Sequence, residues 1–213
     1  MKASDSSSSD APNKGVSRRG FLAVAGGSVA AASFLNACGE DSSASAETGE
    51  FGDGDVGILN YLLTLEYVLA DFYKGLTNST LFNEAERAAL GEFGEQEEKH
   101  AEALVRQIEK ADGEPAPKPK TKFELRLNAA TLELASKLEN AIAAAYLGQL
   151  PKVDSDDLRA KLLEIHSVEG RHAAAMEYLQ GKPVTPDGSF AKPATVKETM
   201  AVMKPYIRES AEA

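Results

Sequence analysis

The chain has one cysteine and no tryptophan in its 213 residues. A disulfide needs two cysteines, and thiolate zinc sites and rubredoxin-type iron centres need several. The lone Cys38 therefore excludes all three within the chain. Any metal that binds must be held by oxygen and nitrogen ligands. No run of residues alternates with the two-residue period of a half-buried strand, so the sequence predicts an all-α fold.

Two of the three histidines occur in the same short pattern, Glu-x-x-His. Each copy is preceded by a further glutamate, 31 residues before the pattern in the first half and 30 in the second. The duplicated set consists of Glu66, Glu97, His100, Glu139, Glu169 and His172. Positions i and i+3 of a helix share one face, so the acid and the imidazole of each copy can reach one ion. Four carboxylates and two imidazoles are the ligand set of a two-metal centre in a four-helix bundle.

Each of the four glutamates also stands in the middle of an apolar stripe with helical spacing. In the first stripe, Leu62 and Leu69 flank Glu66 at intervals of four and three residues. An ionised carboxylate buried in this way is costly unless it is paired, hydrogen-bonded or bound to a metal. Two divalent cations would cancel the charge of four glutamates. The alternative is that these acids pair with Lys or Arg, or that the helices turn them to the surface.

The helical periodicity predicts four long helices and a shorter one near the C-terminus. Asn83 and Glu86 are a candidate capping pair for the second helix. The four long helices are expected at about 55–76, 84–111, 124–147 and 154–179, and the short helix at about 195–206. The connection 112–123 contains three prolines, which favour an extended chain able to span the ~35 Å length of a helix. The other two connections are short. The expected fold is therefore two antiparallel hairpins joined by a long crossover.

The first 38 residues predict export. Ser17 to Leu22 resembles a twin-arginine signal, which implies the twin-arginine translocase as a partner. The apolar stretch that follows is shorter than the ~20 residues of a membrane-spanning helix. It ends in Leu35-Asn36-Ala37-Cys38, which looks like a lipobox with Cys38 as the lipidated residue. Asn36 departs from the small or β-branched residue usual there, so the alternative is that Cys38 lies beside a conventional cleavage site.

The predicted organisation has four parts. These are a signal peptide (1–37), a flexible tether (38–53), a four-helix bundle (54–181) and a strap with the short helix (182–213). Without the signal peptide, the chain keeps 19 Lys and Arg against 31 Asp and Glu, since the signal contains 4 of the 23 and 2 of the 33. A net charge of about −12 argues against nucleic acid as a partner.

On the six repeated residues, the chain is similar to bacterial exported ferritin-like domain proteins, a branch of the di-iron and di-manganese carboxylate superfamily. The resemblance covers residues 54–181 and implies a ferritin-like four-helix bundle. It implies that Glu97 and Glu169 bridge two metals, that Glu66 and Glu139 are terminal ligands, and that each histidine binds one metal. The implied cofactor is two iron ions, with manganese as the alternative. Zinc, or no metal at all, is a further alternative, and a homodimer would be ordinary for the family.

The leading hypothesis is a periplasmic or cell-surface protein that binds iron and either oxidises it or reduces peroxide, with oxygen or peroxide as substrates. The second is a lipid-tethered metal-binding or structural protein without turnover. Tyr73 and Tyr146 each lie seven residues after a predicted ligand, Glu66 or Glu139. Each could relay electrons or hydrogen-bond to a metal ligand, or simply pack in the core with its hydroxyl bonded. The stretch 95–99, apart from Glu97, is interpreted as a solvated face.

Overall fold

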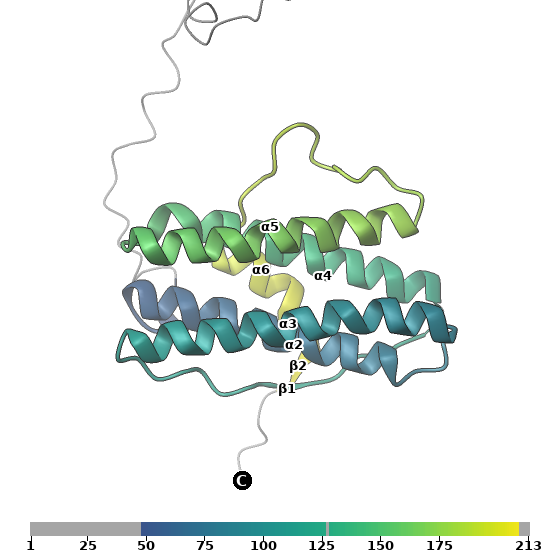
Figure 1. Ribbon diagram of the computed structural model, residues 1–213, viewed down its shortest axis with the longest axis horizontal. Helices are drawn as coiled ribbons and strands as arrows, with labels where there is room; N and C mark the ends of the chain where they lie inside the picture. The colour runs from purple at the N-terminus through teal and green to yellow at the C-terminus, as the bar shows by residue number, and fades with distance from the viewer. Residues whose placement is uncertain (1–47, 127, 209–213) are drawn as a thin grey trace, which may run out of the picture. The chain divides into compact units, whose positions relative to one another are not determined.

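The computed structural model describes residues 48–126 and 128–208, and within them four long helices form a bundle (Figure 1). The helices are α2 (Gly54–Thr77), α3 (Glu84–Lys110), α4 (Asn128–Gln149) and α5 (Asp156–Leu179). This confirms the predicted all-α bundle. No helix in the described ranges is both long enough and apolar enough to cross a membrane. The predicted signal peptide and Cys38 lie outside the described residues.

The helices are arranged as two antiparallel hairpins. Helix α2 packs along α3, and α4 packs along α5. The connection from α3 to α4 runs along the length of the bundle (Figure 1). A short 3-10 turn, η2 (Leu150–Lys152), joins α4 to α5. The connection from α3 to α4 is therefore the long crossover that the prolines predict.

Polar side chains cap the helix starts as local sequence rules require. At the start of α3, the Asn83 side chain accepts the Glu86 backbone N–H at 3.0 Å. The Asn83 backbone N–H donates to the Glu86 carboxylate at 2.8 Å in return, as the capping pair predicts. Ser155 accepts the Leu158 backbone N–H at the start of α5. Each such cap stabilises its helix by about 1 kcal/mol.

Helix α4 begins later than predicted. The chain forms no helix from about residue 124, and α4 starts at Asn128. Shortly before it, β1 (Lys120–Thr121) pairs with β2 (Ile207–Arg208) in a two-stranded antiparallel sheet. The Phe123 ring stacks on Tyr206 at 5.1 Å, and the Lys122 backbone N–H donates to the Tyr206 carbonyl at 2.8 Å. These contacts hold the end of the crossover extended, because it pairs with the C-terminal segment.

The predicted short C-terminal helix is present. It is α6 (Val196–Met203), followed by a 3-10 turn, η3 (Lys204–Tyr206), so the last residues of the predicted helix form a tighter turn. Helix α6 packs on α4 and α2 and buries Met200 and Met203. At the other end of the described chain, a 3-10 turn, η1 (Gly49–Phe51), lies within the predicted tether. The Phe51 ring contacts Tyr61 at 5.4 Å.

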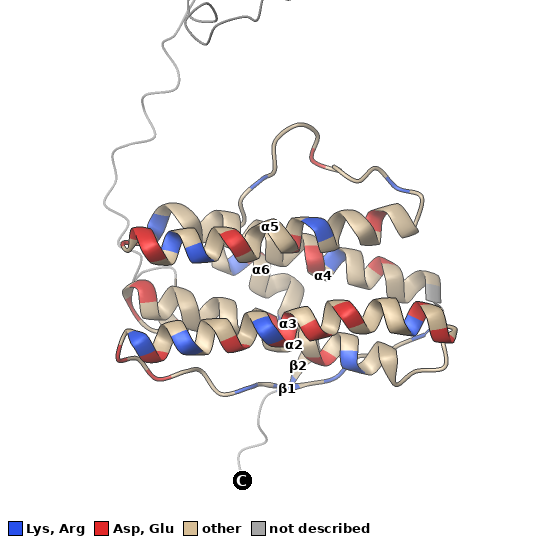
Figure 2. Cartoon of the chain, viewed as in Figure 1, with Lys and Arg blue, Asp and Glu red and all other residues tan. Residues whose placement is uncertain are grey.

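The core lies between the four long helices, and charged residues of both signs are spread along those helices (Figure 2). The apolar stripes predicted from the sequence supply this core. Leu62 and Leu69 are fully buried in α2, as are Leu104 in α3, Ile142 in α4 and Met176 in α5. The glutamates at the centres of the stripes are also 0% exposed: Glu66, Glu97, Glu139 and Glu169. The fold thus places four carboxylates inside an apolar bundle.

Candidate metal centre

The six predicted ligand residues meet in the interior of the bundle, and every long helix contributes at least one of them. The contributions are Glu66 from α2, Glu97 and His100 from α3, Glu139 from α4, and Glu169 and His172 from α5. They form two groups of four side chains, each group with ligand atoms within 4.8 Å of one another. Because each helix places its acid at the middle of a buried face, packing the faces together brings the acids together.

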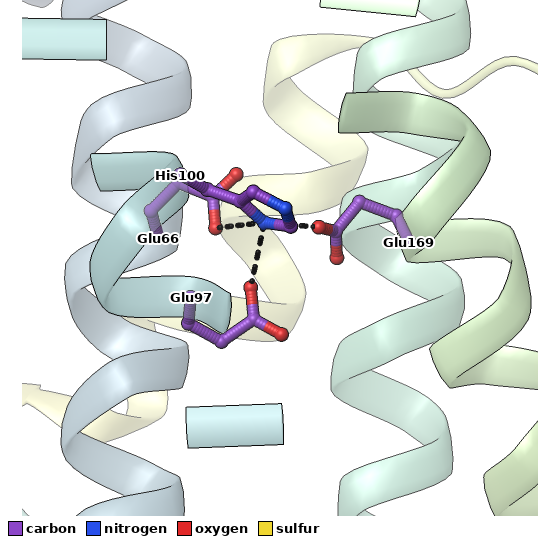
Figure 3. A group of neighbouring side chains, drawn as sticks. All are labelled: Glu66, Glu97, His100 and Glu169. Atoms are coloured by element: carbon purple, nitrogen blue, oxygen red, sulfur yellow. Dashed lines mark hydrogen bonds and ion pairs between the residues drawn. The ribbon is translucent and has the colours of Figure 1, made fainter. Parts of the chain in front are cut away.

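The first group surrounds His100. The imidazole Nδ1 lies 2.7 Å from Oε1 of Glu169, 3.2 Å from Oε2 of Glu97 and 3.7 Å from Oε2 of Glu66 (Figure 3). Glu97 is three residues before His100 on α3, whereas Glu169 reaches across from α5. One imidazole nitrogen and three carboxylates therefore face a common point.

The second group surrounds His172 and has the same arrangement, except that the two hairpins exchange roles. Nδ1 of His172 lies 2.8 Å from Oε1 of Glu97, 3.7 Å from Oε2 of Glu139 and 4.0 Å from Oε2 of Glu169. Glu97 and Glu169 belong to both groups. Two neighbouring positions that share two carboxylates match a dinuclear centre with bridging acids.

Among the described residues, several buried ligand atoms in this cluster have no well-aligned hydrogen-bond partner, although an imidazole and a carboxylate lie close together in two places. They are Oε2 of Glu66, Oε1 of Glu97, Oε2 of Glu139, both carboxylate oxygens of Glu169, and Nδ1 of His172. A buried polar atom left without a partner costs about 1–3 kcal/mol. Cations between the two groups would satisfy these atoms together, so the donor set fits a pair of metal ions.

The four acids do not pair with Lys or Arg in the described part of the chain. Over the described ranges, the only basic side chains that approach the four acids are the two histidines. The helices also do not turn the acids outward, since all four are 0% exposed. The cluster thus has a large excess of carboxylate over positive charge.

Burial changes the acid–base behaviour of the cluster. It raises the pKa of Glu66 to about 7, and it raises the pKa of Glu139 and Glu169, because ionised carboxylates lose their hydration there. Burial alone would lower the pKa of His100. The carboxylates of Glu169, Glu66 and Glu97 beside its Nδ1 favour the charged imidazole, outweigh that effect and raise the pKa to about 12. Without a cation the cluster retains protons, which a metal must displace.

The two tyrosines contact the site across the bundle. The Tyr73 hydroxyl donates to Oε1 of Glu139, and the Tyr146 hydroxyl donates to Oε1 of Glu66. Each phenol therefore binds a carboxylate of the opposite hairpin, not the glutamate seven residues before it. Burial, followed by the nearby carboxylate charge, raises the pKa of both phenols. Each predicted terminal acid is thus left with one free oxygen, Oε2, which faces its histidine.

One polar contact of the site was missed in the sequence. The stretch 95–99 is a solvated face for Glu95, Glu98 and Lys99, which are exposed, but not for Gln96. Oε1 of Gln96 lies 3.0 Å from Nε2 of His172. Nothing in the sequence distinguishes this glutamine from its charged neighbours, because its partner lies 76 residues away in another helix.

The fold and the buried cluster define a class of proteins: four-helix bundles with carboxylate and histidine side chains able to hold metal in the core. The profile of the ferritin-like domain family matches residues 54–182. The chain therefore belongs to the ferritin-like domain family, as its resemblance predicts. A comparison with curated proteins finds no match.

Proposed function

We propose that this protein holds two iron ions in the buried cluster and uses them to oxidise Fe(II) or to reduce peroxide. The observation that carries the proposal is the pair of four-residue groups that share Glu97 and Glu169. Mixed carboxylate and imidazole ligands suit iron and manganese, which exchange electrons with oxygen or peroxide. Manganese is therefore the alternative cofactor.

The residues have distinct roles in this proposal. Glu97 and Glu169 would hold both ions, and Glu66 and Glu139 would each hold one of them. Two bound iron ions would supply one-electron steps to an oxidant such as dioxygen or peroxide. The phenols of Tyr73 and Tyr146 hold the terminal carboxylates in place, and the apolar stripes around the cluster exclude bulk water.

We further propose that the protein works outside the cytoplasm, attached to the membrane of the cell envelope through lipid on Cys38. The support is the twin-arginine pattern at Ser17 to Leu22 and the lipobox that follows it. The translocase that reads this signal carries folded proteins, so a metal chosen in the cytoplasm could be retained during export.

The second candidate is a protein that binds metal for stability without turnover. The observation in its favour is the deep burial of the cluster, in which the four acids are 0% exposed and His172 is 2% exposed. Zinc could fill this role as well as iron, because a metal that only stabilises the fold does not need to change its oxidation state. The two candidates differ in whether added Fe(II) is oxidised.

The test compares the purified chain with its Glu97→Ala variant. We expect about two redox metals per chain by mass spectrometry. We also expect rapid Fe(II) oxidation under air, followed by absorbance and oxygen uptake. Glu97→Ala removes a ligand common to both groups, so metal content and oxidation should fall together, by at least about 100-fold for oxidation.

The matched control is Glu98→Ala, which removes an exposed carboxylate one residue away. It should behave like the unchanged chain. Circular dichroism checks that Glu97→Ala remains folded. Bound metal with no oxidation above the Glu97→Ala background would favour the second candidate. Absence of any bound metal would reject both.

A further inference from the structure

The two histidines of the cluster are held differently. His172 is 2% exposed, and its ring lies between two side chains of α3. Nε2 of His172 meets Oε1 of Gln96 at 3.0 Å, while the ring packs at an angle of 85° on Phe93, with centroids 4.6 Å apart. Nδ1 is left to face Glu97 and Glu139. One nitrogen of this imidazole therefore faces the Gln96 amide, and the other faces carboxylates of the cluster.

His100 lacks this support. Its side chain is 12% exposed, and in the described part of the chain Nε2 makes no hydrogen bond. The position that matches Gln96 in the second half of the sequence is Val168, since each directly precedes a shared glutamate, Glu97 or Glu169. Valine has no side-chain acceptor. The duplication that supplies the ligands therefore does not supply a second glutamine.

The difference has a chemical consequence. A histidine that binds metal through one nitrogen usually donates its other N–H to an acceptor, which sets the tautomer, orients the ring and makes the ligating nitrogen more basic. The Gln96 amide carbonyl is such an acceptor, so Nε2 of His172 carries the hydrogen and Nδ1 keeps its lone pair for the metal. His100 has no such acceptor at Nε2 among the described residues, so its ring is less firmly oriented.

We propose that Gln96 is a positioning residue that makes the two metal positions unequal. The position at His172 fills first and retains its ion. The position at His100 binds more weakly and exchanges its ion with solvent, which makes it the entry point for incoming Fe(II). This inference rests on the proposed dinuclear centre and adds to it the order of loading, which no ligand residue determines by itself.

The experiment is a titration of the metal-free full chain with Co(II), followed by visible absorbance and calorimetry. We expect two separate binding steps. Gln96→Leu keeps the volume but removes the acceptor, so the tighter step should weaken by about 10- to 100-fold while the weaker step is unchanged. Gln96→Glu retains an acceptor and should restore the tighter step. Val168→Leu is the matched control, and it should change neither step.

Double variants assign the effect to one histidine. Gln96→Leu should weaken the single remaining step in a His100→Ala background, and it should have no further effect in a His172→Ala background. Equal weakening in both backgrounds would overturn the proposal, as would two identical steps in the unchanged chain. Failure of the unchanged chain to bind Co(II) at all would instead reject the dinuclear centre. Circular dichroism of each variant separates these results from loss of the fold.

Discussion

The glutamates of the cluster differ in what their oxygens touch. Glu66 and Glu139 each accept a phenol hydrogen bond on one oxygen, whereas the two oxygens of Glu97, and likewise those of Glu169, each face a different histidine. A carboxylate with one oxygen bound by a phenol suits a terminal ligand, and one whose two oxygens face different histidines suits a bridge. The roles that the family resemblance implies therefore have a physical basis in these contacts.

Because of these buried side chains, we expect the stability of the metal-free protein to decrease as pH rises. The pKa of Glu66 is about 7 in the fold against the ordinary value of 4.5. Its contribution to stability is complete below about 4.5 and is lost as pH rises through about 7, because the unfolded chain binds fewer protons. His100 has the same sign, with a contribution that is complete below 6.5 and declines above it, because its pKa is raised to about 12.

The measurement is thermal unfolding in EDTA, followed by circular dichroism at pH 6 and pH 8. The midpoint should be lower at pH 8, with a slope of up to about 1.4 kcal/mol per pH unit for each proton involved. Glu66→Gln should reduce the slope. Metal holds the carboxylates in their ionised form, so the loaded protein should show less of the decrease. A midpoint that rises between pH 6 and pH 8 would contradict this account of the cluster.

Among the elements, the boundaries that depend on local sequence were predicted well. The capping pair at Asn83 and the prolines of the crossover act on neighbouring residues, so the start of α3 and the long connection could be predicted. The start of α4 was placed about four residues early. The contacts that hold the chain extended there come from β2 and Tyr206, more than 80 residues further along the sequence. No local pattern carries that information.

The packing of the strap before α6 leads to a prediction for Gly148. A Cβ at this position would lie 2.1 Å from the carbonyl oxygen of Ala194, and the Ala194 backbone N–H donates to the Ala144 carbonyl at 2.9 Å. Because backbone atoms approach so closely, Gly148→Ala should displace the strap and destabilise the protein by about 1–3 kcal/mol. Urea unfolding of the metal-free chain measures the change.

Gly170→Ala provides the comparison, because Gly170 also lies within a long helix, but in the described part of the chain a Cβ there would meet no heavy atom within 4 Å outside the backbone of its own helix. Alanine favours helix over glycine by about 0.5–1 kcal/mol, so this variant should be equal to the original chain or more stable. Equal stability of the two variants would show that the strap does not depend on the close approach at Gly148.

At the level of the whole bundle, the two hairpins together supply the buried Glu and His cluster. The hydroxyls of Tyr73 and Tyr146 each donate to a carboxylate of the other hairpin, and each histidine faces a glutamate of the other hairpin that belongs to both groups. Neither hairpin contains a full ligand group, because each group of four draws residues from both. The site therefore forms only when the hairpins pack together.

The proposed location applies to the whole chain and can be tested in a bacterial host that has a twin-arginine translocase. The full chain should fractionate with membranes outside the cytoplasm. Cys38→Ala should release it into the soluble fraction, because it removes the lipidated thiol, and replacing Arg18 and Arg19 by Lys should retain it in the cytoplasm. Ser42→Ala is the neighbouring control. An unchanged distribution of the Cys38→Ala chain would contradict lipid anchoring.

The sequence by itself determined the four helices, the hairpin and crossover topology, and the six residues that meet in the core. These follow from helical periodicity, short spacings and proline content, all of which act over neighbouring residues. Only the tertiary structure decided which carboxylate oxygen each phenol binds, and that Gln96 supports His172 while His100 has no such partner in the described part of the chain. Those contacts join residues 66 to 80 positions apart, and only the packing of the two hairpins brings them together.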